Sequence, residues 1–535
     1  MGLADFAKRS ELSRSLSRAV VSGLCASTHE WLLCDFSDDS STHAAAKILA
    51  ASAALAQKFR ALGLKGRIGV AVPPSYLAFA ANYACIFAGL RPVNLNFTLG
   101  EFAAKSCFET AAIDAVISTE NFRDKISKAN PSFPWARNFF DVSQMLSEIG
   151  GDKIAEISRD AVLGVDEFIK KYAISESADN NSEATLVFTS GSEGSPKAAI
   201  LTERNIIANC LQTKLSLVFE DDEILLANLP IFHSFGLLFE AWYMAIHAQK
   251  TVTLNSPLDI KNNIRAVREL KLTSIIGSPT FFRAYLKHAT AEDMSSLRKA
   301  IAGAEKTPAG FHELWNSAFG DTYREGYGLT EASPVVGVNL PARDFGWFST
   351  GSRRGSIGKL FPGMAAKVLN PSTLKELPFG EQGLLAMKGP NIFAGYLNNK
   401  SATENALRDG WLVTGDLARI DPDGFLYIDG RVSRFSKIGG EMVPHATVEA
   451  ALNNELGLAA SDIPLLAVSS RLDEGKGEAL VLLATIDITL AQAKDSLRKA
   501  GISNLWQPKY LVRVDKIPLL PSGKLDLKKL AQLAS

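Results

Sequence analysis

Glycines and hydroxyl-bearing residues interrupt an apolar region of the chain at FTSGSEGSPKAAILTERN, residues 188–205. The apolar run before it predicts a strand over Glu183–Phe188, and we expect a helix to follow the loop. Such a loop suits phosphate, because glycines let backbone N–H groups approach a ligand and hydroxyl groups add further donors. The predicted phosphate-binding residues are Thr189, Ser190, Gly191, Ser192, Gly194 and the cationic Lys197.

A flexible linker and a Walker-type ATPase loop are the alternatives for this stretch. Apolar runs on both sides argue against a linker. No Gly-Lys-Ser/Thr closes the loop, and Pro196 stands before Lys197, so the order is not the Walker pattern. A phosphate loop of another kind is therefore the favoured interpretation.

Three more segments carry groups that a nucleotide needs. EGYGLTEASP contains Glu331, whose carboxylate suits Mg²⁺. WLVTGD contains Asp416, which can accept from ribose hydroxyls, and Arg431 follows after a predicted hairpin. LPSGKLDLKK places Lys524 near the end of the chain. The two basic residues can neutralise charge that develops on phosphate.

The motifs TSGSEGSPK, YGLTE, GWLVTGD, GR…K..GGE and PSGK, in this order, resemble the successive motifs of the adenylate-forming superfamily. The resemblance spans about residues 25–535. LPIFHSFGL, AGAEK and GPNIFAGYL resemble the acyl-acyl-carrier-protein synthetase branch of that superfamily. The resemblance implies a ligase that uses ATP and Mg²⁺ to convert a carboxylic acid into an acyl-adenylate. The acyl group then passes to a phosphopantetheine thiol.

The resemblance also implies residue roles for adenylate formation. Lys524 is expected to bridge the carboxylate and the α-phosphate, and Thr330 to contact the α-phosphate. Glu331 is expected to bind Mg²⁺, with Thr189 as a further ligand. The loop residues named above are expected to cover the β- and γ-phosphates.

The nucleoside is expected to lie against three other segments. Asp416 should hold both ribose hydroxyls with help from Arg431, and Tyr327 should stack on the adenine. The remaining residues implied around the base are Gly303, Ala304, Glu305, Glu325, Gly326 and Gly328. For Gly328 the alternative is that it serves only to form a turn.

Thioester formation should use other residues. His233, in PIFHSFG, is either a satisfied core histidine or lies where acid and thiol meet, and Phe235–Trp242 lines an acyl tunnel or belongs to the core. In the superfamily a small C-terminal domain rotates between the half-reactions. The expected hinge is near Ser433, where relatives carry Asp or Lys, and Lys437 and Glu441 should then reach the site.

A fatty acid and acyl carrier protein are the expected substrate and partner, and coenzyme A is the alternative acceptor. A catalytically silent relative is a further alternative, which the presence of Thr330, Glu331, Asp416 and Lys524 opposes. Lys+Arg and Asp+Glu both number 57, so no global basic field points to nucleic acid. No apolar run reaches the ~18 residues of a membrane span. With scattered cysteines, this predicts a cytoplasmic protein with at most peripheral contact at the inner face of the membrane.

The chain has 535 residues, of which 47% are hydrophobic, and must fold as more than one unit. Short apolar runs alternate with helical periodicity, which predicts an α/β fold. We expect a large N-terminal domain, 1–430, of mixed and parallel sheets with helices and a small β-barrel-like subdomain. A small mobile α+β domain, 431–535, should follow. The predicted strands are Gly66–Val72, Ala112–Ser118, Glu183–Thr189, Glu223–Pro230, Thr251–Leu254 and Leu272–Pro279, and a helix is predicted over Thr202–Leu217.

Overall fold

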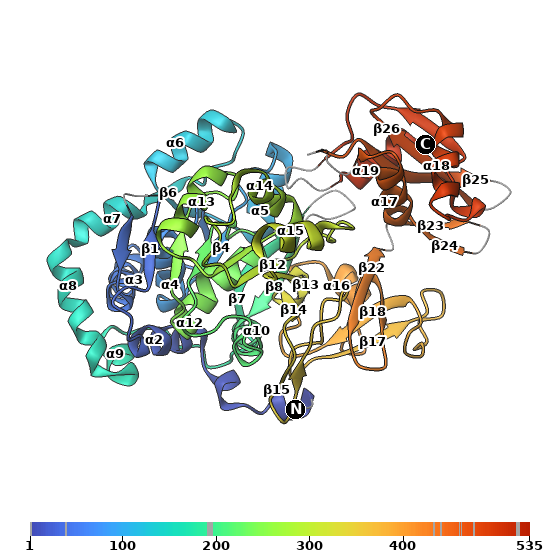
Figure 1. Ribbon diagram of the computed structural model, residues 1–535. Coiled ribbons are helices and arrows are strands. Elements are labelled where there is room, and N and C mark those ends of the chain that lie inside the picture. Colours follow the sequence, from blue (N-terminus) through green and yellow to red (C-terminus); the bar gives the residue numbers. More distant parts are fainter. Residues whose placement is uncertain are drawn as a thin grey trace.

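A computed structural model describes residues 3–37, 40–189, 196–431, 434–438, 441–458, 461, 463–473, 477–519 and 525–535. Within these ranges the side chains at 435, 437, 441, 442, 444 and 477 are not described. The predicted α/β class is confirmed: a large N-terminal domain of mostly parallel sheet with helices precedes a smaller C-terminal domain (Figure 1). The two domains touch where Arg283 Nη1 donates to the Ser461 carbonyl, 3.4 Å away.

The largest sheet has eight strands in the order β14-β13-β12-β11-β9-β10-β1-β2. Strands from β13 to β1 run parallel, and β14 and β2 are antiparallel edges. The inner strands are buried throughout, as expected for strands covered on both faces. Their bounds are β1 Leu33–Asp35, β2 Ser41–His43, β9 Leu225–Ala227, β10 Thr251–Thr253, β11 Ser274–Gly277, β12 Lys299–Ala302, β13 Tyr323–Gly328 and β14 Val335–Val338.

A parallel four-stranded sheet, in the order β4-β3-β5-β6, forms a second layer. A three-stranded sheet, in the order β19-β8-β7, joins it where Thr185 Oγ1 donates to the Pro92 carbonyl at 2.6 Å. The bounds are β3 Arg67–Val70, β4 Arg91–Asn94, β5 Ala115–Ser118, β6 Asn138–Asp141, β7 Glu183–Thr189, β8 Lys197–Thr202 and β19 Gly395–Tyr396.

The helix predicted over Thr202–Leu217 is confirmed as α10, Glu203–Leu215, but a strand that was not predicted lies between it and the glycine-rich loop. Strand β8 begins at Lys197 and pairs antiparallel with β7, which ends at Thr189. The apolar run Ala198–Leu201 can bury its backbone only by pairing, and the helix begins later, at Glu203. Thr202 caps that helix in a capping box with Asn205.

The predicted β-barrel-like subdomain is a twisted five-stranded antiparallel sheet, β17-β18-β21-β20 with β22 paired to β21. The C-terminal sheet is β24-β23-β26-β25 with β27 paired to β26. The bounds are β15 Arg343–Asp344, β16 Ser349–Thr350, β17 Ala365–Leu369, β18 Gly383–Lys388, β20 Leu407–Arg408, β21 Trp411–Ile420, β22 Leu426–Arg431, β23 Phe435–Ile438, β24 Glu441–Pro444, β25 Leu466–Asp473, β26 Gly477–Ala484 and β27 Tyr510–Arg513.

Helices connect most of the parallel strands and cover the sheets (Figure 1). A π-helix, Leu237–Tyr243, lies between α11 and α12. The helices are α1 Leu3–Phe6, α2 Leu16–Ala26, α3 Ala45–Ala61, α4 Tyr76–Phe87, α5 Glu101–Ala111, α6 Glu120–Ala129, α7 Val142–Ile149, α8 Gly151–Arg159, α9 Val165–Lys171, α10 Glu203–Leu215, α11 Ser234–Gly236, α12 Met244–His247, α13 Ile260–Glu269, α14 Pro279–His288, α15 Phe311–Phe319, α16 Lys400–Ala406, α17 His445–Glu455, α18 Leu490–Lys499 and α19 Leu527–Ala534. Among the helices that the structure describes, none is both long and apolar enough to cross a bilayer.

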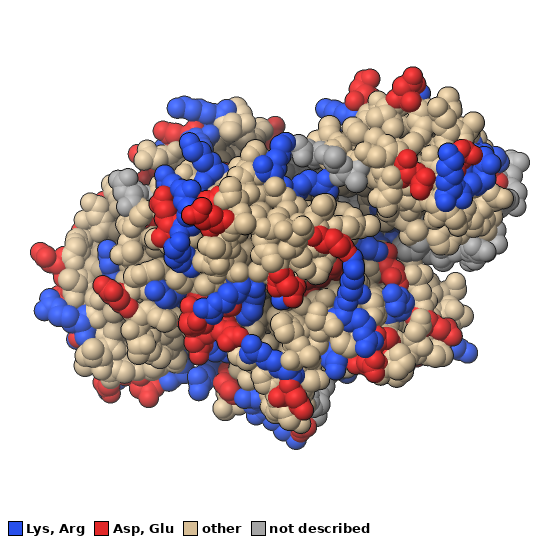
Figure 2. Space-filling view, in the orientation of Figure 1, with Lys and Arg blue, Asp and Glu red and all other residues tan. Residues whose placement is uncertain are grey.

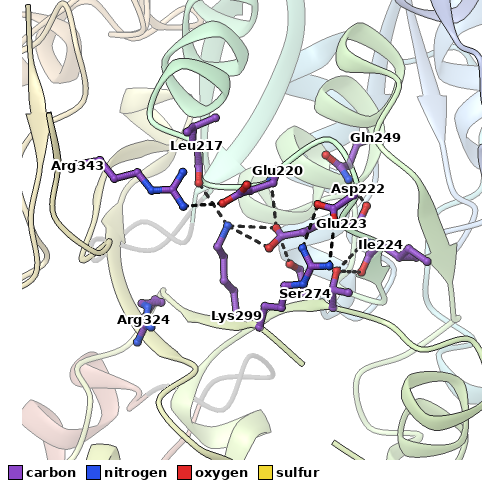
Figure 3. Close-up of polar contacts among 12 residues, drawn as sticks. Leu217, Glu220, Asp222, Glu223, Ile224, Gln249, Ser274, Lys299, Arg324 and Arg343 are labelled. Carbon is purple, nitrogen blue, oxygen red and sulfur yellow. Dashed lines mark hydrogen bonds and ion pairs between the residues drawn. The ribbon is translucent and has the colours of Figure 1, made fainter. Parts of the chain in front are cut away.

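A buried ion pair lies at the amino ends of the large sheet (Figure 3). Lys299, the first residue of β12, places its Nζ 3.1 Å from the carboxylate of Glu223, which precedes β9 and is 1% exposed. Ser274 Oγ, at the start of β11, donates to the same carboxylate at 3.0 Å. This network ties together three strand starts at the edge opposite to the one that carries most of the predicted site.

Candidate functional site

The carboxyl ends of the parallel strands bring several predicted residues to one edge. Strand β12 leads into Gly303–Glu305, β13 leads into Thr330 and Glu331, and β9 leads into the turn that carries His233. Loops at this edge of an open parallel sheet are the usual place for ligands. The β7-β8 hairpin and the β21-β22 hairpin approach the same edge through the contacts described next.

Glu331 is held by a tyrosine from a different sheet. The hydroxyl of Tyr396, in β19, donates to Glu331 Oε1 at 2.6 Å. Lys197 Nζ, in β8, lies 5.6 Å from the centre of the same tyrosine ring. Burial and the neighbouring carboxylate raise the pKa of Tyr396, so the phenol keeps its proton and stays a donor. Tyr396 thus joins the predicted phosphate loop to the predicted metal ligand.

Asp416 connects β13 with the β21-β22 hairpin. Its carboxylate is 2% exposed and accepts from Arg431 Nε at 2.8 Å on one oxygen and from the Tyr327 hydroxyl on the other. The carboxylates of Asp416 and Glu331 raise the pKa of Arg431. Each carboxylate oxygen has a second lone pair, so a ribose hydroxyl can still bind there.

The segments predicted to flank adenine lie on neighbouring strands. Residue 302 of β12 pairs with Glu325 of β13, and burial raises the pKa of Glu325. A Cβ on Gly303 would lie 3.3 Å from the Phe235 ring. A Cβ on Gly328 would lie 2.3 Å from the Pro334 carbonyl oxygen, so glycine is required there by close backbone approach.

The other residues predicted around the base lie in the same place. Thr280 Oγ1 donates to Glu305 Oε2 at 2.6 Å. Ala304 adopts a left-handed backbone with φ of +67°, and Gly326 pairs with Val338 of β14. These residues lie in β13 and directly after β12.

His233 is exposed and begins the short helix α11. The next residue, Ser234, places its Oγ 3.2 Å from Thr330 Oγ1. The turn after β9 is therefore in polar contact with the segment predicted to bind the α-phosphate. Residues Leu237–Trp242 are buried in the core, which favours the core interpretation over the tunnel for that stretch, whereas Phe235 is half-buried beside Gly303.

Glu331 fits a magnesium ion whose ligands come mostly from a substrate. Among the described residues, no group of three His, Cys, Asp or Glu side chains is gathered as a metal site. Mg²⁺ commonly takes one or two carboxylates and completes its shell with phosphate oxygens and water. The Tyr396 hydroxyl donates to the Glu331 carboxylate, and such a hydrogen bond orients a carboxylate for binding a metal ion. Thr189 is at the end of β7, where its Oγ1 donates to the Lys197 carbonyl at 3.5 Å.

Several predicted site residues lie outside the described residues: Ser190, Gly191, Ser192, Gly194, Ser433 and Lys524, together with the side chains of Lys437 and Glu441. Sequence reasoning assigned no role to Tyr396 or Ser234. Both lie inside motifs that were noticed, GPNIFAGYL and PIFHSFG, so the signal was present. What the sequence alone does not show is that the tyrosine reaches Glu331 across 65 positions.

Comparison with known proteins gives consistent results. The model of the family described as "AMP-binding enzyme" matches residues 28–397. An acyl-CoA ligase, SID4, of Ajellomyces capsulatus is 36% identical over 275 residues, which are 50% of this chain and 46% of that protein. A long-chain-fatty-acid–CoA ligase of Bacillus subtilis is 27% identical over 489 residues, 87% of this chain and 85% of the relative. The chain thus spans about half the length of the first relative and most of the second.

Solved structures agree on the fold. ATP-bound MatB from Rhodopseudomonas palustris superposes with a TM-score of 0.78 at 23% identity, covering 96% of this chain and 98% of that one. The alignment therefore includes the C-terminal unit as well as the large sheets.

Proposed function

Because the chain belongs to the AMP-binding enzyme family, we propose that it is an ATP-dependent acid–thiol ligase that activates a fatty acid as its acyl-adenylate. The observation that carries the proposal is the pairing of Asp416 with Arg431 beside the Lys197–Tyr396–Glu331 contacts, the Glu331 carboxylate acting on the Arg431 guanidinium. These groups offer what two anions need in order to react: charge neutralisation and alignment. The names of the relatives, which are acyl-CoA and long-chain-fatty-acid–CoA ligases, support the reaction class.

Each residue has a task in this proposal. Asp416 and Arg431 orient the ribose, and Thr330 and Lys524 place the α-phosphate against the acid. Mg²⁺, when bound at Glu331, would neutralise phosphate charge. We further propose that the N-terminal domain ends at residue 430 and that the C-terminal domain, from residue 431, rotates after adenylation. We also propose a cytoplasmic location with at most peripheral membrane contact.

The acceptor in our proposal is the phosphopantetheine thiol of acyl carrier protein. The motifs of that synthetase branch support it, whereas the relatives' names favour coenzyme A as a second candidate. Carrier protein is acidic and would need a basic surface at the thiol entrance. On the face in Figure 2, Lys and Arg side chains are interspersed with Asp and Glu. Charge on this face therefore does not decide between the two acceptors.

The experiment is an assay of acids of different chain length, each supplied with purified carrier protein or with coenzyme A. We expect pyrophosphate release with fatty acids and thioester formation with carrier protein. Lys524→Ala should abolish pyrophosphate release while ATP binding stays measurable, and Lys528→Ala, an exposed lysine in the same segment, is the matched control. Normal pyrophosphate release by Lys524→Ala would contradict the proposed role of Lys524. A preference for coenzyme A over carrier protein would show that coenzyme A is the acceptor.

A further inference from the structure

Glu240 is a carboxyl group enclosed in the core. It lies in the π-helix Leu237–Tyr243 and is 0% exposed. Burial raises its pKa well above the usual range, although the hydrogen bond from the Leu229 amide opposes that effect. Burial therefore favours the protonated form of this group. Burying a carboxyl group is costly, and none of the roles proposed above uses this one.

The carboxyl group reaches back to the turn after β9. Glu240 Oε1 accepts from the backbone N–H of Leu229 at 2.8 Å. On the other side of the π-helix, the Tyr83 hydroxyl donates to the Ala241 carbonyl at 2.6 Å. Widened π-helical turns occur frequently at functional sites. Here the turn is held by two hydrogen bonds, one made by the Glu240 side chain and one made by the Ala241 carbonyl.

The turn after β9, whose Leu229 N–H donates to Glu240, is in backbone contact with the start of helix α11. The His233 N–H donates to the Pro230 carbonyl at 3.0 Å. A Cβ on Gly236 would lie 2.8 Å from the Pro230 carbonyl oxygen and 3.0 Å from that of Leu229. Only glycine allows this approach, so the Glu240 hydrogen bond and the Gly236 contact together restrict where the turn can lie.

The same turn carries the groups that face the site. His233 is exposed, and Ser234 Oγ lies 3.2 Å from Thr330 Oγ1. We propose that Glu240 is a positioning residue that fixes Leu229 and thereby holds Ser234, which follows His233, against Thr330. This inference rests on the proposed function, in which Thr330 binds the α-phosphate.

The second carboxyl oxygen of Glu240 indicates which substitutions test its role. Glu240 Oε2 is buried, and no residue that the structure describes hydrogen-bonds to it. An unpaired buried polar atom destabilises a fold, so a residue kept only for stability would not be of this type. Glutamine preserves the acceptor that Leu229 needs, whereas methionine fills similar space without it.

The test compares Glu240→Gln and Glu240→Met in the full chain, with Leu238→Met as the matched control in the same π-helix; Leu238 is also buried. Acid-dependent pyrophosphate release, the KM for ATP, the thermal midpoint and hydrogen–deuterium exchange of the peptide containing Leu229 are measured. We expect Glu240→Met to lower kcat at least tenfold with the KM for ATP within twofold. Glu240→Gln should keep at least half of the wild-type kcat, and the thermal midpoints of Glu240→Met and Leu238→Met should be similar.

Exchange at Leu229 should accelerate in Glu240→Met and not in Glu240→Gln, whatever the substrate is. A wild-type protein that releases no pyrophosphate with any acid would overturn the proposed function and the catalytic part of this inference, while exchange would still report on the hydrogen bond. Unchanged exchange in Glu240→Met, or a kcat within twofold of wild type, would overturn the role of Glu240 itself. So would a Glu240→Gln variant as impaired as Glu240→Met.

Discussion

Charged residues gather at both edges of the large sheet, but in different ways. At the amino ends, Glu223 and Lys299 are buried in an ion pair, and Ser274 and the Leu217 carbonyl contact it (Figure 3). At the carboxyl ends, Asp416 also pairs with a cation, Arg431, but its other oxygen and Glu331 Oε1 accept from the hydroxyls of Tyr327 and Tyr396. The first arrangement places opposite charges against each other in the core. The second adds tyrosine donors that orient the carboxylates.

The difference shows how to separate structural from functional charge in one protein. A pair in which both partners are buried, as in Glu223–Lys299, serves the fold, and its removal should destabilise the chain; Arg431, which pairs with Asp416, is by contrast 63% exposed. Carboxylates oriented by Tyr327 and Tyr396 keep lone pairs for a ligand, and their removal should leave the fold and stop the reaction. Four experiments test this distinction, in order of expected effect.

Asp416→Asn should have the largest effect on activity. The change weakens charge-assisted hydrogen bonds worth about 1.5–3 kcal/mol each, so kcat/KM should fall by roughly a hundredfold or more. Stability should change little. Pyrophosphate release and urea unfolding are the measurements. Asp421→Asn is the matched control, because Asp421 pairs with Arg353 at the turn of the same hairpin. Equal losses in both variants would contradict the comparison.

Lys299→Met should act in the opposite way. It leaves Glu223 buried without its cation, which destabilises the fold by about 3–5 kcal/mol. The kcat of the protein that remains folded should stay within twofold. Urea unfolding measures the first effect. Arg298→Met, which removes an exposed pair with Asp222, is the control and should cost less than about 1 kcal/mol. A tenfold loss of kcat in Lys299→Met would show that this edge is not purely structural.

The amino edge should also govern part of the pH dependence of stability through His247, which ends α12. Burial lowers its pKa to about 3, from about 6.5 in an unfolded chain. Between these values the unfolded state binds more protons than the folded state, so stability rises with pH and is lost on acidification. Going from pH 7 to 5 should cost about 2 kcal/mol from this group.

Urea unfolding of the wild type and of His247→Gln at both pH values isolates the contribution of His247. The difference is needed because burial also lowers the pKa of His43 to about 4 and that of His445 to about 3. Parallel pH profiles in the two proteins would contradict the assignment.

Tyr396→Phe should have the smallest effect. Losing the hydrogen bond to Glu331 frees the carboxylate to rotate, which typically lowers metal affinity by about tenfold. The Mg²⁺ concentration that gives half-maximal pyrophosphate release should rise, with kcat at saturating Mg²⁺ changed less. Tyr427→Phe is the control, since the Tyr427 hydroxyl contacts Asp421 at 3.3 Å. An unchanged Mg²⁺ dependence would contradict the proposal that Tyr396 orients a metal ligand.

The sequence predicted the sheets well because buried parallel strands are apolar throughout. Glu183–Thr189 has the bounds expected, and the other predicted strands are confirmed but shorter, such as Leu225–Ala227 within Glu223–Pro230. The strand at Lys197–Thr202 was missed because AAILT reads equally well as the start of the amphipathic segment that follows. Only its pairing with β7 decides between these states.

The site was predictable as a set of residues but not as a set of contacts. Glu331, Asp416 and Arg431 carry recognisable chemistry, and the motifs place them in order. Glu240 carries no such signal, because its surroundings FGLLFEAWYM are apolar and its carboxylate accepts from a backbone amide. Interactions between a side chain and a distant main-chain group leave no pattern in a single sequence.

The order of the strands around the glycine-rich loop bears on when the site can form. The β7-β8 hairpin is local in the chain and can form within microseconds. Its third strand, β19, comes almost two hundred residues later, with Tyr396 paired to Ala199. During synthesis from the N-terminus, the hairpin can therefore form before its third strand has been synthesised. A nascent chain that stops short of Gly395 would lack both that strand and the tyrosine that holds Glu331.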